Sequence, residues 1–373
     1  MRGGTSNAIV FHRRDLPADV AEWPRVFLAA MGSPDPNGRQ LNGMGGGISS
    51  LSKICVVGPP SRLDADIDYS FFQIGVKDNT VDISGNCGNM SSAMGPFALD
   101  EGLVPAPESG TATVRIHNTN TKKIILSHFP VKDGRAAVEG DFDLPGVAGT
   151  SAPIRLEFLD PGGAGTGQLL PTGNARDSLQ VPELGIVDVS MVDAANPCVF
   201  VDAGALGRRG DELPGDLDID TDCLRWLESI RLAASVAMSI APNKTAAAAI
   251  PSIPKVAMLA APRDTVTLSG AKLGAEDFDI LVRMISVGQP HRAVPLTGAL
   301  CLGVAMRVPG SVAHALASKT AGPARIANPS GLLVVDADVG EENGQIVARH
   351  GAVYRSARRL FEGNVLIPKG AVS

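Results

Sequence analysis

Several features that would indicate a membrane or nucleic-acid protein are absent from this sequence. Aromatic residues make up only 4% of the 373 residues, and no apolar run approaches the roughly 20 residues that a membrane span needs. The start at Met1-Arg-Gly-Gly lacks the apolar core of a signal peptide. The formal net charge is −6 and no long basic run occurs. We therefore expect neither a membrane nor a nucleic-acid partner.

Cysteine is also scarce, and its distribution excludes two kinds of site. The five cysteines are odd in number and show no Cys-x-x-Cys spacing. This argues against a disulfide framework and against a zinc site, so we expect no metal. A reducing cytoplasm fits this pattern. The five residues are Cys55, Cys87, Cys198, Cys223 and Cys301.

The abundant residues indicate a globular chain with many turns. The sequence has 42 glycines and 27 prolines, with 44% hydrophobic and 19% charged residues. A length of 373 residues is long for one core and sufficient for two domains.

The most informative stretch is Ser84-Gly-Asn-Cys-Gly-Asn-Met-Ser-Ser-Ala-Met-Gly95. It follows a strand-like run, 79–83, and precedes a helix-like run, 90–99, so Cys87 is predicted at a strand-to-helix turn. Glycines there let the backbone approach a ligand, and the free N–H groups of a helix start favour a carboxylate or a thiolate. An inert core cysteine is the alternative, but it would need neither glycine nor polar neighbours.

A second glycine-rich stretch runs from Leu41 to Lys53 and leads into a predicted strand, 54–57. It lacks the spacing of a nucleotide-phosphate loop, and no helix follows its lysine. A lysine at a strand entrance is often only a surface charge. Here Lys53 follows a loop of glycines and hydroxyls and directly precedes an apolar strand, so it is a candidate general base.

Apolar periodicity predicts the remaining elements. The interval 141–152, rich in glycine and proline, is predicted to be a linker. Predicted helices cover 15–31, 224–240 and the run after 296, where Thr297 and Gly298 are expected to cap the helix; predicted strands cover 8–11, 66–76, 112–117, 123–128, 154–158, 187–193, 198–202, 256–260 and 280–287.

The pattern restarts in the second half of the chain. The opening turn and strand around Asn7 resemble those around Asn196, and Pro295 to Pro309 repeats the strand-to-helix turn of the first half. This weak repeat predicts two pseudo-symmetric domains. A site would lie in the cleft where the two helix N-termini meet.

Many short motifs together resemble the PrpF-like isomerase family, which has the diaminopimelate-epimerase fold. The resemblance covers nearly the whole chain in order. The motifs are Met1-Arg-Gly-Gly-Thr-Ser, Gly43-Met-Gly-Gly-Gly, Ser52-Lys53, Gly85-Asn-Cys-Gly-Asn89, Gly95-Pro-Phe-Ala, Arg115-Ile-His-Asn-Thr-Asn120, Leu170-Pro-Thr-Gly-Asn174, Ala195-Asn-Pro197, Leu296-Thr-Gly298 and Asn328-Pro-Ser-Gly331.

The resemblance implies an α+β fold of two domains, 1–150 and 151–373, with a last strand that crosses back to the first domain. Each domain would be a curved β-sheet or barrel around a central helix. The activity implied is isomerisation of unsaturated di- or tricarboxylates without a cofactor, on substrates such as aconitate, 2-methylaconitate, methylitaconate or 4-oxalomesaconate. The resemblance is compatible with a homodimer.

The family's proposed acid/base groups match Lys53 and Cys87. We expect the substrate to be a small polycarboxylate, held by groups near the two helix starts and in the glycine-rich segments. The expected substrate-binding residues are Arg2, Thr5, Ser6, Asn7, Met44, Gly45, Ser52, Asn86, Gly88, Asn89, Asn196, His291, Thr297 and Gly298.

Two departures from the family keep other readings open. Members usually carry lysine or arginine where this chain has Asn7, and they usually have a short strand before the Arg-Gly-Gly motif. One alternative is therefore an inactive polycarboxylate-binding or accessory protein. The other, suggested by the epimerase relatives of this fold and not by these departures, is a racemase or epimerase acting at an α-carbon, which uses two opposed thiols, one in each half. The matching turn offers Thr297 or Gly298 there, while Cys301 is several residues inside the predicted helix.

Overall fold

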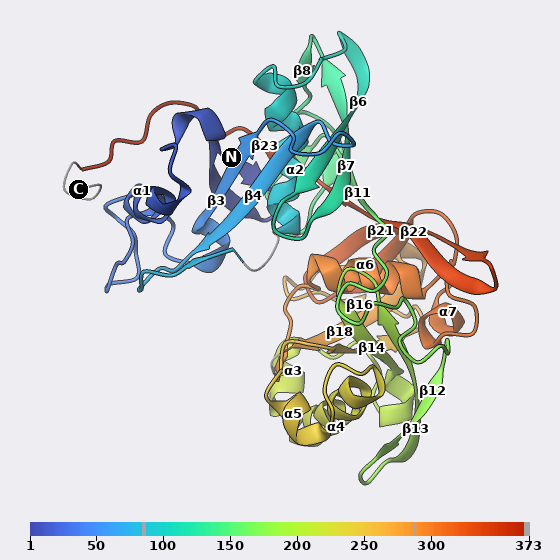
Figure 1. Ribbon diagram of the computed structural model, residues 1–373. Coiled ribbons are helices and arrows are strands. Elements are labelled where there is room, and N and C mark those ends of the chain that lie inside the picture. The colour runs from blue at the N-terminus through green and yellow to red at the C-terminus, as the bar shows by residue number, and fades with distance from the viewer. Residues whose placement is uncertain (84–86, 287, 369–373) are drawn as a thin grey trace. The chain divides into compact units, whose positions relative to one another are not determined.

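The computed structural model describes residues 1–83, 87–286 and 288–368 (Figure 1). The chain divides into two compact units, which are described separately. Unit 1 comprises Met1–Glu157 and Tyr354–Ser373, and unit 2 comprises Phe158–Val353. The domain boundary at residues 150/151 stays a prediction. Among the described helices, none combines the length and the apolar character needed to cross a bilayer.

Unit 1 is built on a mixed sheet in which parallel and antiparallel neighbours alternate. The β2–β3 and β4–β6 pairs are parallel, whereas β1–β2, β3–β4 and β6–β7 are antiparallel. Short strands extend it, with β5 on β4, β8 and β11 on β7, and β23 on β1. The strands are β1 (Arg2–Gly3), β2 (Ser6–His12), β3 (Lys53–Gly58), β4 (Ile67–Ile74), β5 (Val81–Asp82), β6 (Ser109–Asn118), β7 (Lys123–Lys132), β8 (Arg135–Ala136), β11 (Ile154–Leu159) and β23 (Ala357–Arg358).

Helix α2 (Gly88–Asp100) is the central element of unit 1. It contacts strands from β23 and β1 at one edge of the sheet to β7 and β8 at the other, so the sheet curves around it. Its residues from Met90 to Leu99 are all buried. Gly95 is needed on this face, since a Cβ there would lie 2.6 Å from the Ser127 hydroxyl. The helix is therefore enclosed and its first turn is fixed relative to the strands.

Helix α1 (Trp23–Met31) packs on the opposite face of the same sheet. Trp23 and Phe27 share a hydrophobic cluster with Ile54 and Val56 of β3. The predicted helix over 15–31 is wrong in its first half, which forms two short 3-10 turns, η1 (Arg13–Asp15) and η2 (Val20–Glu22). The predicted linker over 141–152 contains a two-stranded pair, β9 (Phe142–Asp143) with β10 (Thr150–Ser151), and belongs to unit 1.

Unit 2 has a mixed sheet with helices on both faces (Figure 1). Helix α6 (Leu296–Ala305) contacts β13, β14 and β21, and α4 (Thr221–Ala237) contacts β12, β14 and β15. The strands are β12 (Asp177–Val181), β13 (Gly185–Asp193), β14 (Pro197–Asp202), β15 (Lys255–Ala260), β18 (Ile280–Ser286), β19 (Gln289–Pro290), β20 (Ala324–Asn328), β21 (Gly331–Glu342) and β22 (Gln345–Arg355), with β16 (Thr265–Val266) and β17 (Lys272–Leu273) as a separate pair. Shorter helices are α3 (Pro214–Ile219), α5 (Lys244–Ala248) and α7 (Val312–Leu316).

The two units repeat one connectivity. Unit 1 runs β1–β2–α1–β3–β4–β5–α2–β6–β7. Unit 2 runs β13–β14–α4–β15–β18–β19–α6–β20–β21 when the insertions α3, α5, α7 and the β16–β17 pair are left aside. The corresponding pairs have the same direction, because β14–β15 and β18–β20 are parallel while β13–β14, β15–β18 and β20–β21 are antiparallel. Helices α2 and α6 therefore occupy equivalent places in the two sheets.

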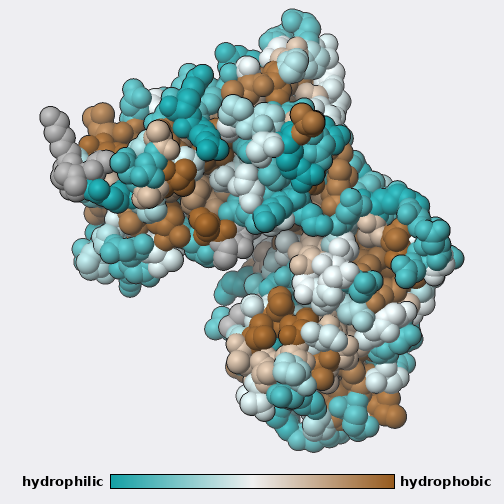
Figure 2. All heavy atoms as spheres, in the orientation of Figure 1, coloured by the Kyte–Doolittle hydropathy of each residue, from teal (hydrophilic) through white to brown (hydrophobic). Residues whose placement is uncertain are grey.

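The visible surface carries hydrophobic side chains in separate patches among hydrophilic ones (Figure 2). Among the most exposed apolar residues are Leu63, Leu366, Ile219 and Leu41. Such residues are common on folded proteins and do not by themselves define an interface.

Candidate active site

Cys87 lies at the start of α2, as the sequence predicts. It is the N-cap residue, with an extended backbone (φ −102°, ψ 97°), and Gly88 is the first helical residue. The Cys87 side chain is half-buried. Its carbonyl oxygen accepts hydrogen bonds from the Ser91 amide (3.0 Å) and the Ser91 hydroxyl (3.2 Å). Cys87 therefore lies at the end of the helix where the orphan N–H groups and the positive end of the dipole favour an anion.

The Arg-Gly-Gly segment packs directly on this helix start. A Cβ on Gly3 would lie 2.7 Å from the Asn89 carbonyl oxygen, and one on Gly4 would lie 2.3 Å from Asn89 Oδ1. Gly4 also has φ +52°, where glycine is favoured. Asn89 Nδ2 donates to Thr5 Oγ1 at 3.0 Å. The glycine pair is thus required for close approach, and it brings Thr5 beside the first turn of α2.

Lys53 is the first residue of β3 and its side chain is held in place. Its Nζ donates to Gln73 Oε1 at 2.5 Å and lies 5.1 Å from the centre of the Phe71 ring. Gln73 Nε2 in turn donates to the carbonyl oxygens of Ser49 and Ser52, both at 3.0 Å. These bonds fix the amide so that its oxygen faces Lys53. Gln73 is a positioning residue that the sequence did not reveal.

Lys53 and Cys87 lie near a common buried group, the thiol of Cys55. Ile54 and Val56 face α1, so Lys53 and Cys55 face α2 by strand alternation. Burial and the neighbouring Cys87 raise the pKa of Cys55, whereas Lys53 lowers it. Cys55 Sγ donates to Tyr69 Oη at 3.8 Å. The structure thus brings both predicted acid/base residues to the same face of the sheet, beside the start of α2.

A buried guanidinium, Arg355, completes this group, and no local sequence pattern indicates it. Only 6% of Arg355 is exposed. Its Nε donates to Asn89 Oδ1 at 3.1 Å, and its Nη1 donates to the Tyr354 carbonyl oxygen at 2.9 Å. Burial lowers the pKa of Arg355 to about 10, while interaction with Cys87 opposes that shift. A fixed positive charge beside Cys87 attracts a carboxylate to this place.

Other predicted residues have structural partners in this region. Arg2 donates to the carbonyl oxygens of Gly4 (2.9 Å) and Ser356 (3.0 Å), and burial lowers its pKa. Ser6 is buried in β2. Ser52 donates to Gln40 Oε1 at 2.6 Å.

Gln40 organises the glycine-rich loop, since a Cβ on Gly45 would lie 2.2 Å from Gln40 Oε1. Gln40 Oε1 also accepts a hydrogen bond from the Gly47 amide at 2.9 Å. The loop therefore closes around a buried amide and thereby positions the start of β3.

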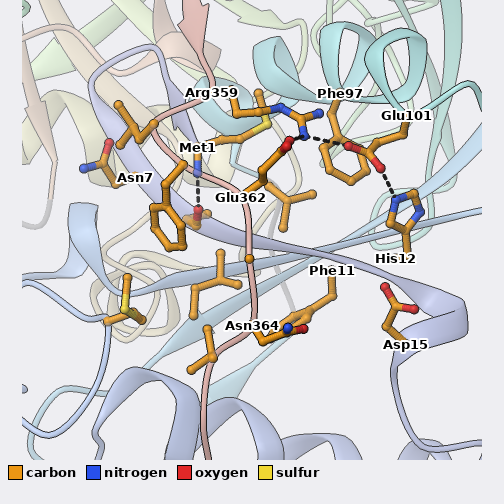
Figure 3. A pocket seen from close by; sticks show the side chains of 18 of the residues that line it. Met1, Asn7, Phe11, His12, Asp15, Phe97, Glu101, Arg359, Glu362 and Asn364 are labelled. Atoms are coloured by element: carbon orange, nitrogen blue, oxygen red, sulfur yellow. Dashed lines mark hydrogen bonds and ion pairs between the residues drawn. The ribbon is translucent and has the colours of Figure 1, made fainter.

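Asn7 and Met44 line a different cavity, of about 760 Å³, beside β2 (Figure 3). Neither Lys53 nor Cys87 is among its lining residues. Ala8 is in register with Lys53 on the parallel strand, so Asn7 faces the other side of the sheet. Within the described residues, the structure does not bring Asn7 to the group around Cys87. Asn86 lies outside the described residues.

In unit 2, the predicted residues lie around the start of α6. Thr297 and Gly298 are in its first turn, but the N-cap is Pro295, so the predicted cap by Thr297 and Gly298 is wrong. Gly298 packs on Met284, where a Cβ would lie 2.6 Å from the sulfur. Asn196 Nδ2 donates to the Pro197 carbonyl oxygen at 2.9 Å.

His291 precedes α6, and its Nε2 is buried without a hydrogen-bond partner among the described residues. Burial and the charge of Lys255 lower the pKa of His291.

Cys301 lies inside α6 and is completely buried. Its Sγ donates to the Val192 carbonyl oxygen at 3.3 Å, and burial raises its pKa. It is therefore not placed at the helix start, where a second reactive thiol would have to be.

Comparison with known proteins gives one consistent result. Residues 1–368 match the family described as PrpF protein. The chain is 38% identical over 381 residues to a 2-methyl-aconitate isomerase of Shewanella oneidensis, covering 99% of this chain and 96% of that protein. It is 39% identical over 373 residues to a 3-methylitaconate isomerase of Eubacterium barkeri, with coverage of 99% and 96%. A crystal structure of methylitaconate-delta-isomerase superposes with a TM-score of 0.92 at 38% identity, covering 100% of this chain and 95% of that one.

Proposed function

The chain belongs to the PrpF family, and we propose that it isomerises unsaturated di- or tricarboxylates by moving a proton, without a cofactor. The family members similar to it are named as isomerases of 2-methylaconitate and 3-methylitaconate. Both names describe carboxylates with a carbon–carbon double bond. The proposed class of reaction is therefore cis–trans exchange or an allylic shift of that bond.

The observation that carries this proposal is the group around the start of α2. It combines a half-buried thiol at Cys87, an amine fixed by Gln73 at Lys53, and the buried guanidinium of Arg355. Arg355 and the helix N–H groups favour a carboxylate close to Cys87. Lys53 and Cys87 supply two groups that can accept or donate a proton.

In the proposed mechanism, Lys53 or Cys87 removes a proton from the carbon next to the double bond. The negative charge then spreads through a dienolate onto the bound carboxylate. The N–H groups of α2 and Arg355 bind this developing charge more strongly than the ground state, which lowers the barrier. Proton return to the far carbon shifts the double bond, whereas rotation before return to the original carbon gives cis–trans exchange.

Proton NMR in D2O tests this proposal directly. The protein is incubated in turn with trans-aconitate, cis-aconitate, 2-methylaconitate, methylitaconate and 4-oxalomesaconate. We expect deuterium incorporation or a new alkene signal with at least one of them, lowered by about 100-fold or more in Lys53→Ala and Cys87→Ser. Lys132→Ala, which changes an exposed lysine at the end of β7, is the matched control and should retain wild-type exchange.

Absence of exchange with every compound, in a folded protein, would contradict the isomerase. If the same protein still bound these compounds, the alternative of an inactive polycarboxylate-binding protein would replace it. A two-thiol racemase finds no support at α6, where Cys301 is buried inside the helix. The expectation that the helix starts of both domains share one cleft stays a prediction.

A further inference from the structure

The glycine-rich loop, residues 41–52, needs its glycines for contacts within the protein. A Cβ on Gly46 would lie 2.6 Å from Leu51 Cδ1, and one on Gly47 would lie 2.5 Å from the Gly38 carbonyl oxygen. Gly47 also has φ +74°, in the left-handed region that favours glycine. The close approach that these glycines allow is therefore to other parts of unit 1.

The loop folds around one buried amide, Gln40, of which only 1% is exposed. Gln40 Nε2 donates to Ser33 Oγ at 2.8 Å, and Gln40 Oε1 accepts from the Gly47 amide at 2.9 Å and from the Ser52 hydroxyl at 2.6 Å. Ser52 is completely buried, so its hydroxyl is used inside the loop. Because both ends of the amide have partners, Gln40 has one orientation, and it fixes the end of the loop at Ser52.

Gln73 joins the loop to Lys53. Lys53 and Gln73 are directly opposite each other in the antiparallel pair β3–β4, so their side chains lie on the same face of the sheet. The carbonyl oxygens of Ser49 and Ser52 both accept from Gln73 Nε2 at 3.0 Å. The amide nitrogen must therefore point to the loop, and this directs Oε1 to Lys53 Nζ, from which it accepts at 2.5 Å.

A carboxamide is a suitable partner for a lysine that has to release and regain a proton. Its oxygen accepts an N–H from the ammonium and from the neutral amine alike, so the contact survives a change of protonation state. A carboxylate in the same place would favour the ammonium form. The Phe71 ring, whose centre lies 5.1 Å from Nζ, limits the amine on a second side. The position of Lys53 Nζ is thus determined by β4 and, through Gln73, by the loop.

We propose that the glycine-rich loop positions Lys53 through Gln73, and that Ser52 belongs to this positioning network rather than to the groups that bind substrate. The inference rests on the proposed function, in which Lys53 transfers a proton. Gln40, Ser52 and Gln73 are positioning residues, since they act through Lys53. Preorganisation of a proton acceptor favours the transition state more than the bound ground state, so loss of the network should lower kcat and leave KM nearly unchanged.

Steady-state kinetics on the full chain test the inference with whichever alkene the wild type isomerises. We expect Gln73→Met to lower kcat about tenfold or more and Ser52→Ala about threefold or more, while KM stays within about twofold in both. Gln345→Met, which changes an exposed glutamine of β22, is the matched control and should retain both constants. In a Lys53→Ala background, Gln73→Met should cause no further loss, because it acts through that lysine.

Trace acetylation with acetic anhydride, read by peptide mass spectrometry, reports the contact between Gln73 and Lys53 without any turnover. Lys53 is buried, and its labelling relative to that of the exposed Lys132 should rise about threefold or more in Gln73→Met, because the hydrogen bond that holds the amine is lost. Gln73→Ala replaces the methionine variant in both experiments if that variant does not fold.

Three results would overturn the inference: a raised KM with unchanged kcat in either variant, which would place that side chain at the substrate; wild-type kcat in a folded Gln73 variant; or wild-type labelling of Lys53 in that variant. Failure of the proposed function is distinguishable from these results. If the wild type isomerised no alkene while the labelling of Lys53 still rose in Gln73→Met, the isomerase would be refuted and the positioning of Lys53 would stand.

Discussion

Arg355 shows how a distant residue can determine the chemistry of a motif. Its guanidinium is buried, donates a hydrogen bond to Asn89 in the first turn of α2, and interacts with Cys87. Arg355 and Asn89 are 266 residues apart in sequence. A buried charge is retained only when it is paired or hydrogen-bonded. The charge on Arg355 is therefore compensated best when a substrate carboxylate is bound beside it.

Replacing Arg355 with methionine should make Cys87 less reactive towards an anionic reagent. Without the positive charge a carboxylate beside Cys87 is less favoured, and we expect alkylation of Cys87 by iodoacetate at neutral pH to slow by about tenfold. Intact-mass spectrometry over time measures the rate, and the other four cysteines, all buried, should not react in the folded protein. Arg355→Lys should restore much of the rate.

Arg358→Met provides the matched control, because this arginine is exposed on β23 three residues further on. It should leave the alkylation rate unchanged. Equal rates in the wild type and in folded Arg355→Met would show that Arg355 does not influence the thiol. A general loss of structure in Arg355→Met would instead expose all five cysteines and be visible as multiple alkylation.

The C-terminal end of α2 is tied to the sheet through one carboxylate. Glu101, the residue after the last helical residue, accepts hydrogen bonds from His12 Nε2 at 2.8 Å and from Arg359 Nη1 at 2.6 Å (Figure 3). The bond from His12 is the main cause that lowers the pKa of Glu101, with Arg359 contributing. These contacts join β2, α2 and the segment after β23.

We expect this carboxylate to make stability depend on pH in the acid range. Because the pKa of Glu101 is lower in the folded state, its contribution is present above the unfolded value of about 4.3 and is lost as pH falls through the folded value. Glu101→Gln should lower the free energy of unfolding near pH 7 by about 1–2 kcal/mol and reduce the loss of stability on acidification. Urea unfolding at a series of pH values measures both effects.

Glu139→Gln, which changes an exposed carboxylate of the same unit, should change neither quantity. The prediction for Glu101 is wrong if its glutamine variant shows the wild-type dependence on pH. Other carboxylates, such as Asp68 and Asp220, also have lowered pKa values. The stability of every variant should therefore still fall to some extent as the pH is lowered.

Local sequence patterns predict most of the helices and strands. They fail where a local turn or cap, which the periodicity of apolar residues does not reveal, sets the start of a helix. The strand before Cys87, the helix after it and the hairpin of β6 and β7 follow from turn residues and apolar spacing. The helix over 15–31 was predicted too long because Asp19 accepts from the Ala21 amide and starts a separate turn. The cap at Thr297 failed because Pro295 already provides the extended residue before the helix.

The contacts that complete the site could not be predicted in this way. Gln73 meets Lys53 because β3 and β4 pair in one particular register, and Arg355 meets Asn89 because the chain returns to β1 near its end. Such pairings join residues far apart in sequence, and no local periodicity specifies them. The repeat was weak in its residues, yet it is clear in the order and direction of the strands.

The return of the chain to unit 1 makes that unit depend on both ends of the sequence. β23 pairs with β1 through Arg2–Arg358 and Gly3–Ala357, and the amide of Gly4 donates to the Ser356 carbonyl oxygen at 2.9 Å. Unit 2 is continuous from Phe158 to Val353 and has its own hydrophobic cluster. Removal of the last segment should therefore affect the two units unequally.

A chain that ends at Val353 should lose the fixed structure of the β1–α2 region and all isomerase activity, because it lacks Arg355 and β23. A chain that ends at Glu362 keeps Arg355, β23 and Arg359. It should therefore retain most of the structure of the β1–α2 region and most of the isomerase activity. Hydrogen–deuterium exchange, read by peptide, measures the difference: in the shorter chain the amides of β2 and α2 should exchange faster, while those of β14 and β15 stay protected. Equal protection of unit 1 in the two chains would show that β23 and Arg355 do not hold the candidate site together.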